Sequence, residues 1–306
     1  MIKSWIKNTA RIYLPVYQYE SESKRIIYAG YSTIKRNYYV RFLLGKDSDF
    51  NFLGRYWYKK IPDLINHDHV DIGVAEISRT TIDFFQDCNG YVLPIWINGK
   101  LNIDRPLEEI INHNRYKIIL KKIRNHNLTY DIVSDYDSFK DFNGHFYLPF
   151  ISKRHGNEAF IEDLNSLWNT SPAPMIMCIK ENGITVGMSL FRISGEHLFL
   201  LRVGLLNGNV EYRQHGVLGA AYYFAIIEGQ KMGCKSIDMG GSRPFLTDGV
   251  TCFKIGLGAW FESNSNNQDE FLWFSMNEES TAATEFVKNN PFMFFTKDFK
   301  LVCHES

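Results

Sequence analysis

Residues 213–259 read RQHGVLGAAYYFAIIEGQKMGCKSIDMGGSRPFLTDGVTCFKIGLGA, and this stretch decides the fold. In its first part, residues 216–231, small and apolar residues recur at steps of three and four, which is the period of a helix. A short strand is expected over residues 235–239, and the glycines Gly240 and Gly241 should break it sharply. The stretch therefore predicts a helix, a strand and a glycine-rich turn, in that order.

Glycines and basic residues flank this predicted helix and strand. The first N–H groups of a helix lack internal partners, and the helix dipole makes that end positive. Gly216 and Gly219 would let an anion approach the backbone there, although they would equally allow tight packing of the helix. With Arg213, Arg243 and Lys254 nearby in sequence, we predict an anion-recognition site.

Composition excludes several classes of protein. Lys plus Arg and Asp plus Glu both number 34, so the chain does not coat nucleic acid by bulk charge, and DNA is not an expected partner. The N-terminus has lysines but no apolar run typical of a signal peptide, and no stretch is long enough for a membrane helix. We therefore expect a cytoplasmic protein without an integral membrane segment. The odd and scattered cysteines predict neither a disulfide framework nor a zinc site.

The first hundred residues are rich in strand-forming residues and turn signals. Short helices are expected over residues 57–65 and 79–87. His67-Asp68-His69 has the composition of a metal cluster, but a solvated loop explains two histidines without a third ligand better, and no metal site is expected. Strands are expected over residues 11–19, 25–31, 38–44, 70–77 and 91–97.

A helix opened by Pro106 is expected over residues 107–125. Its five basic residues form either a solvated face or a basic ridge beside a polyanionic donor. The turn-like residues 125–127 suggest a domain boundary. The basic residues are Arg115, Lys117, Lys121, Lys122 and Arg124.

The second half alternates strands and helices. Three successive strands, which should form an antiparallel meander, lead into the helix over residues 216–231. The Asn182-Gly183 pair tolerates positive φ and is typical of a hairpin turn. Strands are expected over residues 129–134, 175–180, 185–193, 197–203, 270–276, 292–295 and 300–303, and further helices over 136–153, 158–168 and 278–288.

This order of elements resembles the GNAT acyltransferase fold, in which a meander leads to a helix whose N-terminus holds the donor's pyrophosphate. The residues themselves more closely resemble the Fem-type branch, the FemABX aminoacyltransferases and their relatives. The matching segments are residues 146–149, 153–156, 213–219, 237–242 and 249–258, the last being similar to a Fem-type signature of glycine, Phe-Lys and glycine. The specific resemblance covers about residues 140–260.

The resemblance implies an α/β (α+β) fold with tandem GNAT-like domains, each a mixed sheet flanked by helices. Residues 1–125 would form a degenerate N-terminal domain, and residues 126–306 the better-preserved acyltransferase domain. One feature departs from the GNAT pattern: Arg213 and Gly216 fit the pyrophosphate loop, but Leu218 stands where a small residue is expected and Gly219 follows one position later. No tightly bound cofactor is implied, and the donor is either aminoacyl-tRNA or acyl-CoA.

Acyl transfer to an amine requires a held donor, a deprotonated amine and a stabilised oxyanion. The Fem-type resemblance makes Lys254 the candidate for oxyanion stabilisation, in a cleft where its replacement should leave folding nearly unchanged. Asp238 would either assist proton transfer or cap the turn, and His215 would act as a base or serve structure. Donor contacts are expected from Arg213, Gly216, Gly219, Gly240, Gly241, Ser242 and Arg243, and acceptor contacts from Tyr212, His155 and Phe253.

These residues favour an acyl- or aminoacyltransferase acting on an amine of a small molecule or of a cell-wall or surface-glycan precursor, with tRNA as one candidate donor carrier. Two alternatives stay open: a CoA-dependent N-acyltransferase that acts on an amino sugar or another small molecule, and a GNAT-like binding protein without catalytic activity.

Overall fold

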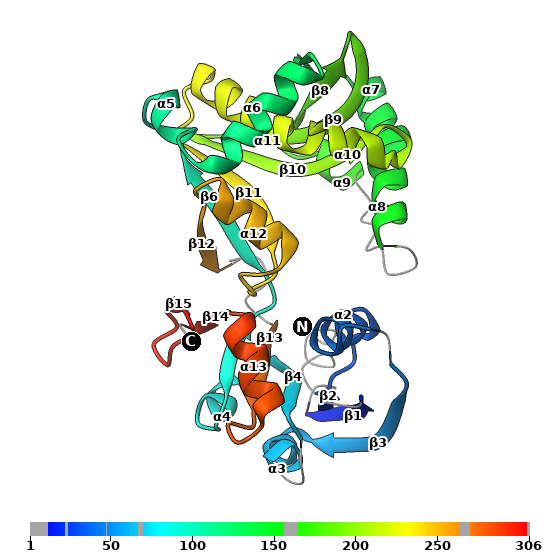
Figure 1. Ribbon diagram of the computed structural model, residues 1–306, viewed down its shortest axis with the longest axis vertical. Helices are drawn as coiled ribbons and strands as arrows, with labels where there is room; N and C mark the ends of the chain where they lie inside the picture. The colour runs from blue at the N-terminus through cyan, green and yellow to red at the C-terminus, as the bar shows by residue number, and fades with distance from the viewer. Residues whose placement is uncertain are drawn as a thin grey trace. The chain divides into compact units, whose positions relative to one another are not determined.

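The computed structural model describes residues 12–21, 24–46, 48–66, 70–155, 165–263 and 270–304. The chain divides into two compact units (Figure 1). The first unit comprises residues 1–97, 242–252 and 262–306, and the second comprises residues 98–241 and 253–261. The expected boundary was near residue 125. In this division residues 98–125 belong to the second unit, and the last part of the chain returns to the first unit.

The first unit is built on an eight-stranded mixed sheet in the order β15-β14-β5-β13-β4-β2-β1-β3. Strand β13 pairs antiparallel with both β4 and β5, so a strand beyond residue 269 fills the middle of a sheet begun by the N-terminus. The elements are β1 (Tyr13–Glu20), β2 (Arg25–Ala29), α2 (Thr33–Leu44), β3 (Phe50–Trp57), η1 (Tyr58–Lys60), α3 (Ile61–Asn66), β4 (Ile72–Ser78), α4 (Ile82–Gln86), β5 (Tyr91–Pro94), β13 (Glu270–Met276), α13 (Thr281–Asn289), β14 (Met293–Phe295) and β15 (Leu301–Cys303).

Helices cover both faces of this sheet. On β4, Ile72 and Val74 join a core that includes buried residues of α2 and α13, whereas Ala75 and Ile77 join a core that includes α3 and α4. Successive side chains of a strand point to opposite faces, which explains why β4 is buried along its whole length.

The strand expected over residues 38–44 is wrong, because these residues form the second half of helix α2. The aromatic and β-branched residues suggested a strand, but two caps define a helix. The Ser32 side chain accepts a hydrogen bond from the Lys35 N–H at the start, and Gly45 takes a left-handed φ of 75° at the end.

The second unit is built on a seven-stranded mixed sheet in the order β12-β6-β11-β10-β9-β8-β7. The expected meander is confirmed, since β7 to β10 pair antiparallel in sequence order. The elements are β6 (Ile97–Asn102), α5 (Leu107–Ile110), α6 (Asn114–Asn125), β7 (Leu128–Val133), α7 (Tyr136–Asp141), η2 (Phe142–Tyr147), α8 (Leu148–His155), α9 (Asn165–Trp168), β8 (Met175–Glu181), β9 (Ile184–Ser194), β10 (His197–Leu205), η4 (Leu206–Gly208), α10 (Val210–His215), α11 (Val217–Lys231), β11 (Ser236–Ser242), α12 (Gly249–Gly256) and β12 (Trp260–Ser263).

The two faces of this sheet also carry separate cores. On β8, Met177 and Ile179 pack in the core shared with α6 and α11, while Ile176 and Cys178 pack in the core shared with α7 and η2. The expected fold class, a mixed α/β structure with sheets flanked by helices, is confirmed in both units. Within the described residues, none of the helices combines the length and the apolar content that crossing a membrane requires.

The stretch that decides the fold forms a βαβ unit. Strand β11 runs parallel to β10, with His197, Leu198 and Phe199 opposite Ser236, Ile237 and Asp238, and α11 connects the two strands. A crossover helix returns over the sheet, so the N-terminus of α11 lies on the side where β10 ends, beyond the three paired residues of the β10–β11 ladder.

Two details of this stretch differ from expectation. Gly240 and Gly241 do not end the strand, because β11 continues to Ser242, although Gly240 takes a left-handed φ of 76°. The expected glycine-bounded segment over residues 249–258 contains helix α12, capped by Asp248, whose carboxylate accepts from the N–H groups of Val250 and Thr251.

Candidate functional site

The candidate functional site is the edge of the second unit where β10 and β11 end and α11 begins. In open α/β sheets, ligands bind outside the carboxyl ends of parallel strands, beside the helix N-terminus. The β10–β11 ladder runs to Phe199 opposite Asp238, and the left-handed Gly240 follows. The carboxyl end of β11 and the first turn of α11 are therefore the two parts of the site.

Asp238 fixes the turn at Gly240. Its Oδ1 accepts from the N–H of Gly240 at 2.8 Å, and its Oδ2 accepts from Nδ2 of Asn98 on β6 at 3.4 Å. Of the two roles that the sequence left open, the turn-capping one has a geometric basis here. Asn98 was not among the predicted site residues, since it lies far from Asp238 in sequence.

Lys254 lies at the same end of β11. Its ammonium donates to the carbonyl oxygen of Gly240 at 2.6 Å and to that of Gly241 at 3.0 Å. The residue is only 1% exposed, so the expectation of a lysine in a cleft is wrong. Gly99 on β6 makes room for this side chain, because a Cβ at Gly99 would lie 2.9 Å from Cδ of Lys254.

The arrangement at the end of β11 therefore consists of a buried cation and a carboxylate that hold two consecutive glycines. Charged hydrogen-bonding groups in a dry site act at higher effective strength than in water. We expected replacement of Lys254 to leave folding nearly unchanged because we expected the side chain to be accessible. Since the side chain is buried, we now expect its replacement to destabilise the fold. What this end of the strand can offer a substrate is a backbone held in one conformation beside a positive charge.

At the start of α11, the glycines serve packing. Gly216 ends α10 and begins α11 with a φ of 93°, and a Cβ there would lie 2.7 Å from Cδ of Lys122 on α6. At Gly219 a Cβ would lie 2.9 Å from Cγ1 of Ile119, also on α6. Both glycines thus allow α11 to approach α6, and Leu218 between them packs against the same core. Two roles were expected for these glycines, the approach of an anion and tight packing of the helix. The contacts with α6 support tight packing.

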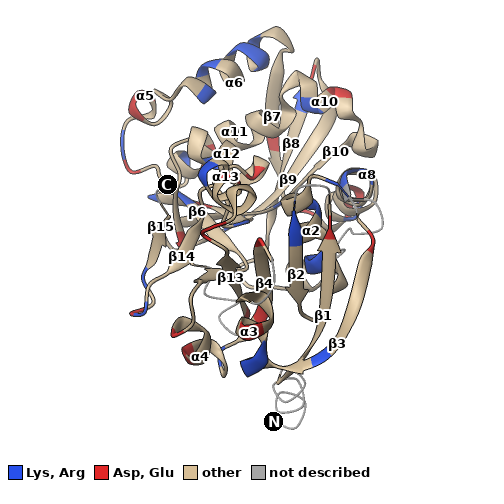
Figure 2. Cartoon of the chain, turned by 60° about the horizontal axis from the view of Figure 1, so that its bottom comes forward, with Lys and Arg blue, Asp and Glu red and all other residues tan. Residues whose placement is uncertain are grey.

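Positive charge is exposed around this helix start. Arg213 lies exposed in the last turn of α10, and Lys122 donates to the carbonyl of Gln214 at 2.7 Å. Lys117, Lys121 and Arg124 are exposed along α6. Figure 2 shows these basic positions along α6 and α10. Of the basic residues of α6, Lys122 contacts the α10–α11 junction, and the exposed ones fit either a solvated face or a basic ridge.

Of the predicted acceptor residues, the side chains of Phe253 and Tyr212 are described, and each packs against the core of the second unit. Phe253 packs in the second unit, with its ring 5.3 Å from that of Tyr222 and the Arg115 guanidinium 5.6 Å from its centroid. Tyr212 lies on α10, partly buried, with its ring edge-on to that of His215. His155 ends α8, and its side chain lies outside the described residues.

Ser242 and Arg243 lie beyond the point where the chain enters the first unit. Ser242 is buried, with Oγ 3.5 Å from the carbonyl oxygen of Ile97. The Arg243 guanidinium stacks 4.0 Å from the ring centroid of Trp96 and 4.3 Å from that of Tyr38. Burial raises the pKa of Tyr38, and Asp248, which accepts its hydroxyl hydrogen bond, raises it further. Arg243 therefore lies in an aromatic cluster instead of extending as a free phosphate contact.

His215 belongs to a cluster that the sequence did not reveal. Its Nδ1 lies 3.0 Å from the carboxylate of Glu181, and Nδ1 of His126 lies 2.8 Å from the same carboxylate. From the sequence, we expected His126 to lie in the turn at the domain boundary and Glu181 to lie beside a hairpin turn. Their meeting depends on strand pairing, because Glu181 lies opposite Leu128, two residues after His126.

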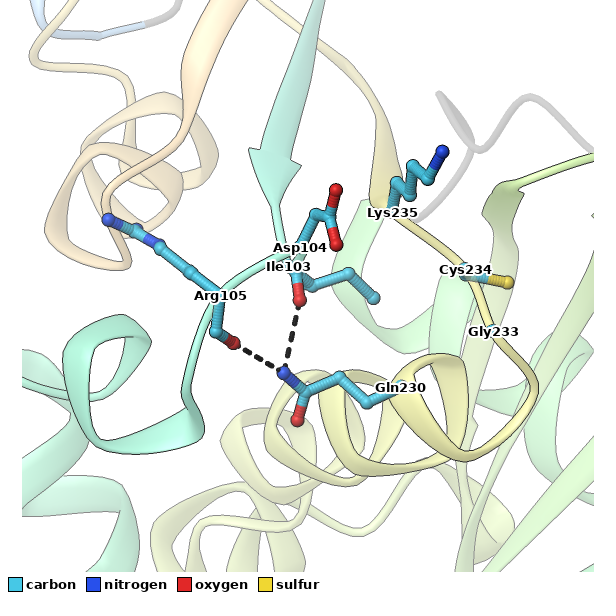
Figure 3. A pocket seen from close by; sticks show the side chains of 7 residues that line it. All are labelled: Ile103, Asp104, Arg105, Gln230, Gly233, Cys234 and Lys235. Carbon is cyan, nitrogen blue, oxygen red and sulfur yellow. Dashed lines mark hydrogen bonds between the residues drawn. The ribbon is translucent and has the colours of Figure 1, made fainter.

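A separate open pocket of about 420 Å³ lies at the other end of α11 (Figure 3). Gln230 spans its floor by donating to the carbonyls of Ile103 and Arg105 at 3.0 and 2.8 Å. Helix α11 has 15 residues and is about 22 Å long, so this pocket is far from the first turn of the helix. The predicted site residues do not line it.

Comparison with known proteins gives structural neighbours only. No family model matches the chain, and no curated protein does. The chain is similar to FemX, at 11% identity and a TM-score of 0.44 over 84% of this chain and 83% of that one. It is similar to L-PGS from Bacillus licheniformis, at 9% identity and a TM-score of 0.41 over 90% and 85%. A third neighbour is a GCN5-related N-acetyltransferase from Sphaerobacter thermophilus, at 12% identity and a TM-score of 0.36 over 85% and 76%.

The structural neighbours thus include FemX and a GCN5-related N-acetyltransferase, as the resemblance of the sequence led us to expect. Identities this low leave the activity to be argued from this chain's own residues. Of the predicted site, the structure brings together Asp238, Gly240, Gly241 and Lys254 at the end of β11. It separately groups Tyr212, Arg213, His215, Gly216 and Gly219 at the α10–α11 junction.

Proposed function

We propose that the protein is an acyltransferase that transfers an acyl or aminoacyl group to an amine at the edge where β10 and β11 end. The observation that carries this proposal is the end of β11, where the buried ammonium of Lys254 holds the carbonyls of Gly240 and Gly241. A fixed backbone beside a buried positive charge is suited to orienting an acyl donor and to stabilising the oxyanion that forms during transfer.

The donor we propose is an aminoacyl-tRNA. Gly216 and Gly219 face α6, so the first turn of α11 lacks the open glycine-rich cradle that a pyrophosphate would need. The exposed cations lie outside that turn, on α6 and at Arg213, in an arrangement suited to a long polyanion. The acceptor we propose is an amine of a cell-wall or surface-glycan precursor.

Within this proposal, Lys254 acts mainly by positioning the glycine pair and by its charge, and Asp238 holds the turn. Arg213 and the α6 cations would contact donor phosphates. His215, which hydrogen-bonds to Glu181, is not assigned a catalytic role.

The test compares two labelled donors with the full-length protein. One reaction contains tRNA charged with a mixture of labelled amino acids, and the other contains labelled acetyl-CoA. Both receive a lysine-containing peptidoglycan precursor or an amino sugar as the amine. We expect label to move from tRNA to the precursor as an amide, with little transfer from acetyl-CoA.

Two other outcomes would replace the proposal. Calorimetric binding of CoA at a Kd of about 1 μM, or −8 kcal/mol, together with acetyl transfer, would favour the CoA-dependent alternative. If the folded wild-type protein and Lys254→Arg both transfer no label from either donor, the alternative of a binding protein without catalytic activity would be favoured.

A further inference from the structure

Three potential metal ligands converge at one corner of the second unit. His126 follows the last residue of α6, Glu181 ends β8 and His215 ends α10. The β7–β8 ladder brings the first two together, and α10 brings the third. Among the residues that the structure describes, this cluster holds three ligand atoms within 4.8 Å of one another.

The side chains already point their ligand atoms inward. Nδ1 of His126 lies 2.8 Å from Oε1 of Glu181, and Nδ1 of His215 lies 3.0 Å from Oε2. The two imidazole rings stack with centroids 4.0 Å apart and planes 18° from parallel. In a tetrahedral zinc site, bonds of about 2.0–2.2 Å place ligand atoms about 3.3 Å apart. The two nitrogen–oxygen distances are a few tenths of an ångström shorter than this, and all three ligand atoms lie within 4.8 Å of one another.

One carboxylate, that of Glu181, contacts both imidazole rings. Two stacked imidazolium rings would repel each other, and one carboxylate can neutralise only one of them.

A further carboxylate lies near the other ring nitrogen of His215, beyond hydrogen-bond distance. Oε1 of Glu211, one helical turn earlier on α10, lies 3.8 Å from Nε2 of His215. Metal-binding histidines usually direct their other ring nitrogen towards a carboxylate, a carbonyl or water, which fixes the tautomer. A bound ion would take the place of the present contact between Nδ1 of His215 and Glu181.

We propose that His126, Glu181 and His215 form a binding site for a divalent transition metal, with Zn²⁺ as the best match. Two imidazole nitrogens and one carboxylate suit Zn²⁺ better than the oxygen-preferring Mg²⁺ or Ca²⁺. The side chains are 30%, 13% and 23% exposed, so the ion can enter and water can complete its coordination.

Such an ion would fix α10 to the ends of α6 and β8. Helix α10 carries Arg213 and leads through Gly216 directly into α11. A metal here would therefore stabilise the second unit and hold the α10–α11 junction in place. This inference does not depend on acyl transfer, because it concerns ligand geometry alone.

The test uses metal binding by the full-length protein after dialysis against EDTA. Zn²⁺ is titrated by calorimetry, and Co²⁺ is titrated by visible absorption, which reports coordination directly. The variants are Glu181→Gln and His215→Asn, which keep similar size and hydrogen-bonding capacity. The matched control is His145→Ala, because His145 pairs with Asp141 at 2.6 Å on an exposed helix face without a second histidine.

We expect the wild-type protein and His145→Ala to bind one Zn²⁺ per chain and to give a four- or five-coordinate Co²⁺ spectrum without a thiolate charge-transfer band. Glu181→Gln and His215→Asn should each weaken Zn²⁺ binding on the order of 100-fold. Absence of saturable binding in the wild type, a thiolate-type Co²⁺ spectrum, or equal affinity in all four proteins would overturn the proposal. The wild-type titration decides even if a variant fails to fold.

Discussion

The end of β11 and the start of α11 belong to the same βαβ unit but use charge in different ways. At the end of β11, Lys254 is 1% exposed and its ammonium is bound to two carbonyls of the backbone. At the start of α11, Arg213 is exposed, as are several basic residues of α6. The first region shapes the backbone, and the second presents charge to solvent.

A sequence motif does not distinguish a buried basic residue from an exposed one, whereas the structure does. Buried charge should matter first for stability, and exposed charge should matter for binding and little for folding. The comparison can be tested one substitution at a time, beginning with the residue whose loss should cost the most.

Lys254→Met should destabilise the protein by about 3 kcal/mol, because the buried ammonium loses two charge-assisted hydrogen bonds, to the carbonyls of Gly240 and Gly241. Urea unfolding monitored by circular dichroism measures this change. The control Lys117→Met removes an exposed lysine and should change stability by less than about 0.5 kcal/mol. Equal stability of the two variants would show that Lys254 does not hold the glycine pair.

Gly216→Ala should cost about 2 kcal/mol. Its φ of 93° is unfavourable for any residue with a Cβ, and the new Cβ would press against the Lys122 side chain. Gly183→Ala is a matched control for the φ effect, because Gly183 has a φ of 85° with open space around it. We expect thermal unfolding to show a larger loss at Gly216. A larger loss at Gly183 would contradict the close contact between α11 and α6.

Asp238→Ala should cost about 1 kcal/mol, because the N–H of Gly240 loses its side-chain acceptor. Asp238→Asn keeps an acceptor oxygen and should recover most of this loss. Thermal unfolding and single-turnover rates of both variants separate the two roles of Asp238. Native stability with lost turnover in Asp238→Asn would assign it to proton transfer instead of turn capping.

Arg213→Ala should have the smallest effect on stability, within about 0.5 kcal/mol. Its effect should appear in donor binding, as weaker affinity for aminoacyl-tRNA and a shallower dependence on salt by about one ion. Filter binding at several salt concentrations measures both. Unchanged affinity and salt dependence would remove Arg213 from the donor surface.

Much of this fold could be predicted from local patterns. The meander and α11 follow from strand-forming runs, a hairpin turn and helical periodicity, all within about 60 residues. Residues 38–44 show where local preference misleads, because the Ser32 and Gly45 caps decide for a helix. The pairing of β13 with β4 joins residues about 200 positions apart, which local patterns do not encode.

The candidate site was predictable as a stretch but not as a geometry. The motif located Asp238, the glycine pair and Lys254, and the structure brings them together. The burial of Lys254 could not be predicted from local sequence, because it depends on the space that Gly99 leaves on β6, a strand far away in the sequence. The cluster of His126, Glu181 and His215 likewise needs three elements to meet.

The central claim, that the donor binds where β10 and β11 end, is tested most directly by hydrogen–deuterium exchange with and without aminoacyl-tRNA. We expect the bound donor to slow exchange in residues 210–218 and 238–242, and to leave residues 103–105 and 230–235 around the open pocket unchanged. Protection of the pocket residues, with the α10–α11 junction and the end of β11 unaffected, would contradict the claim.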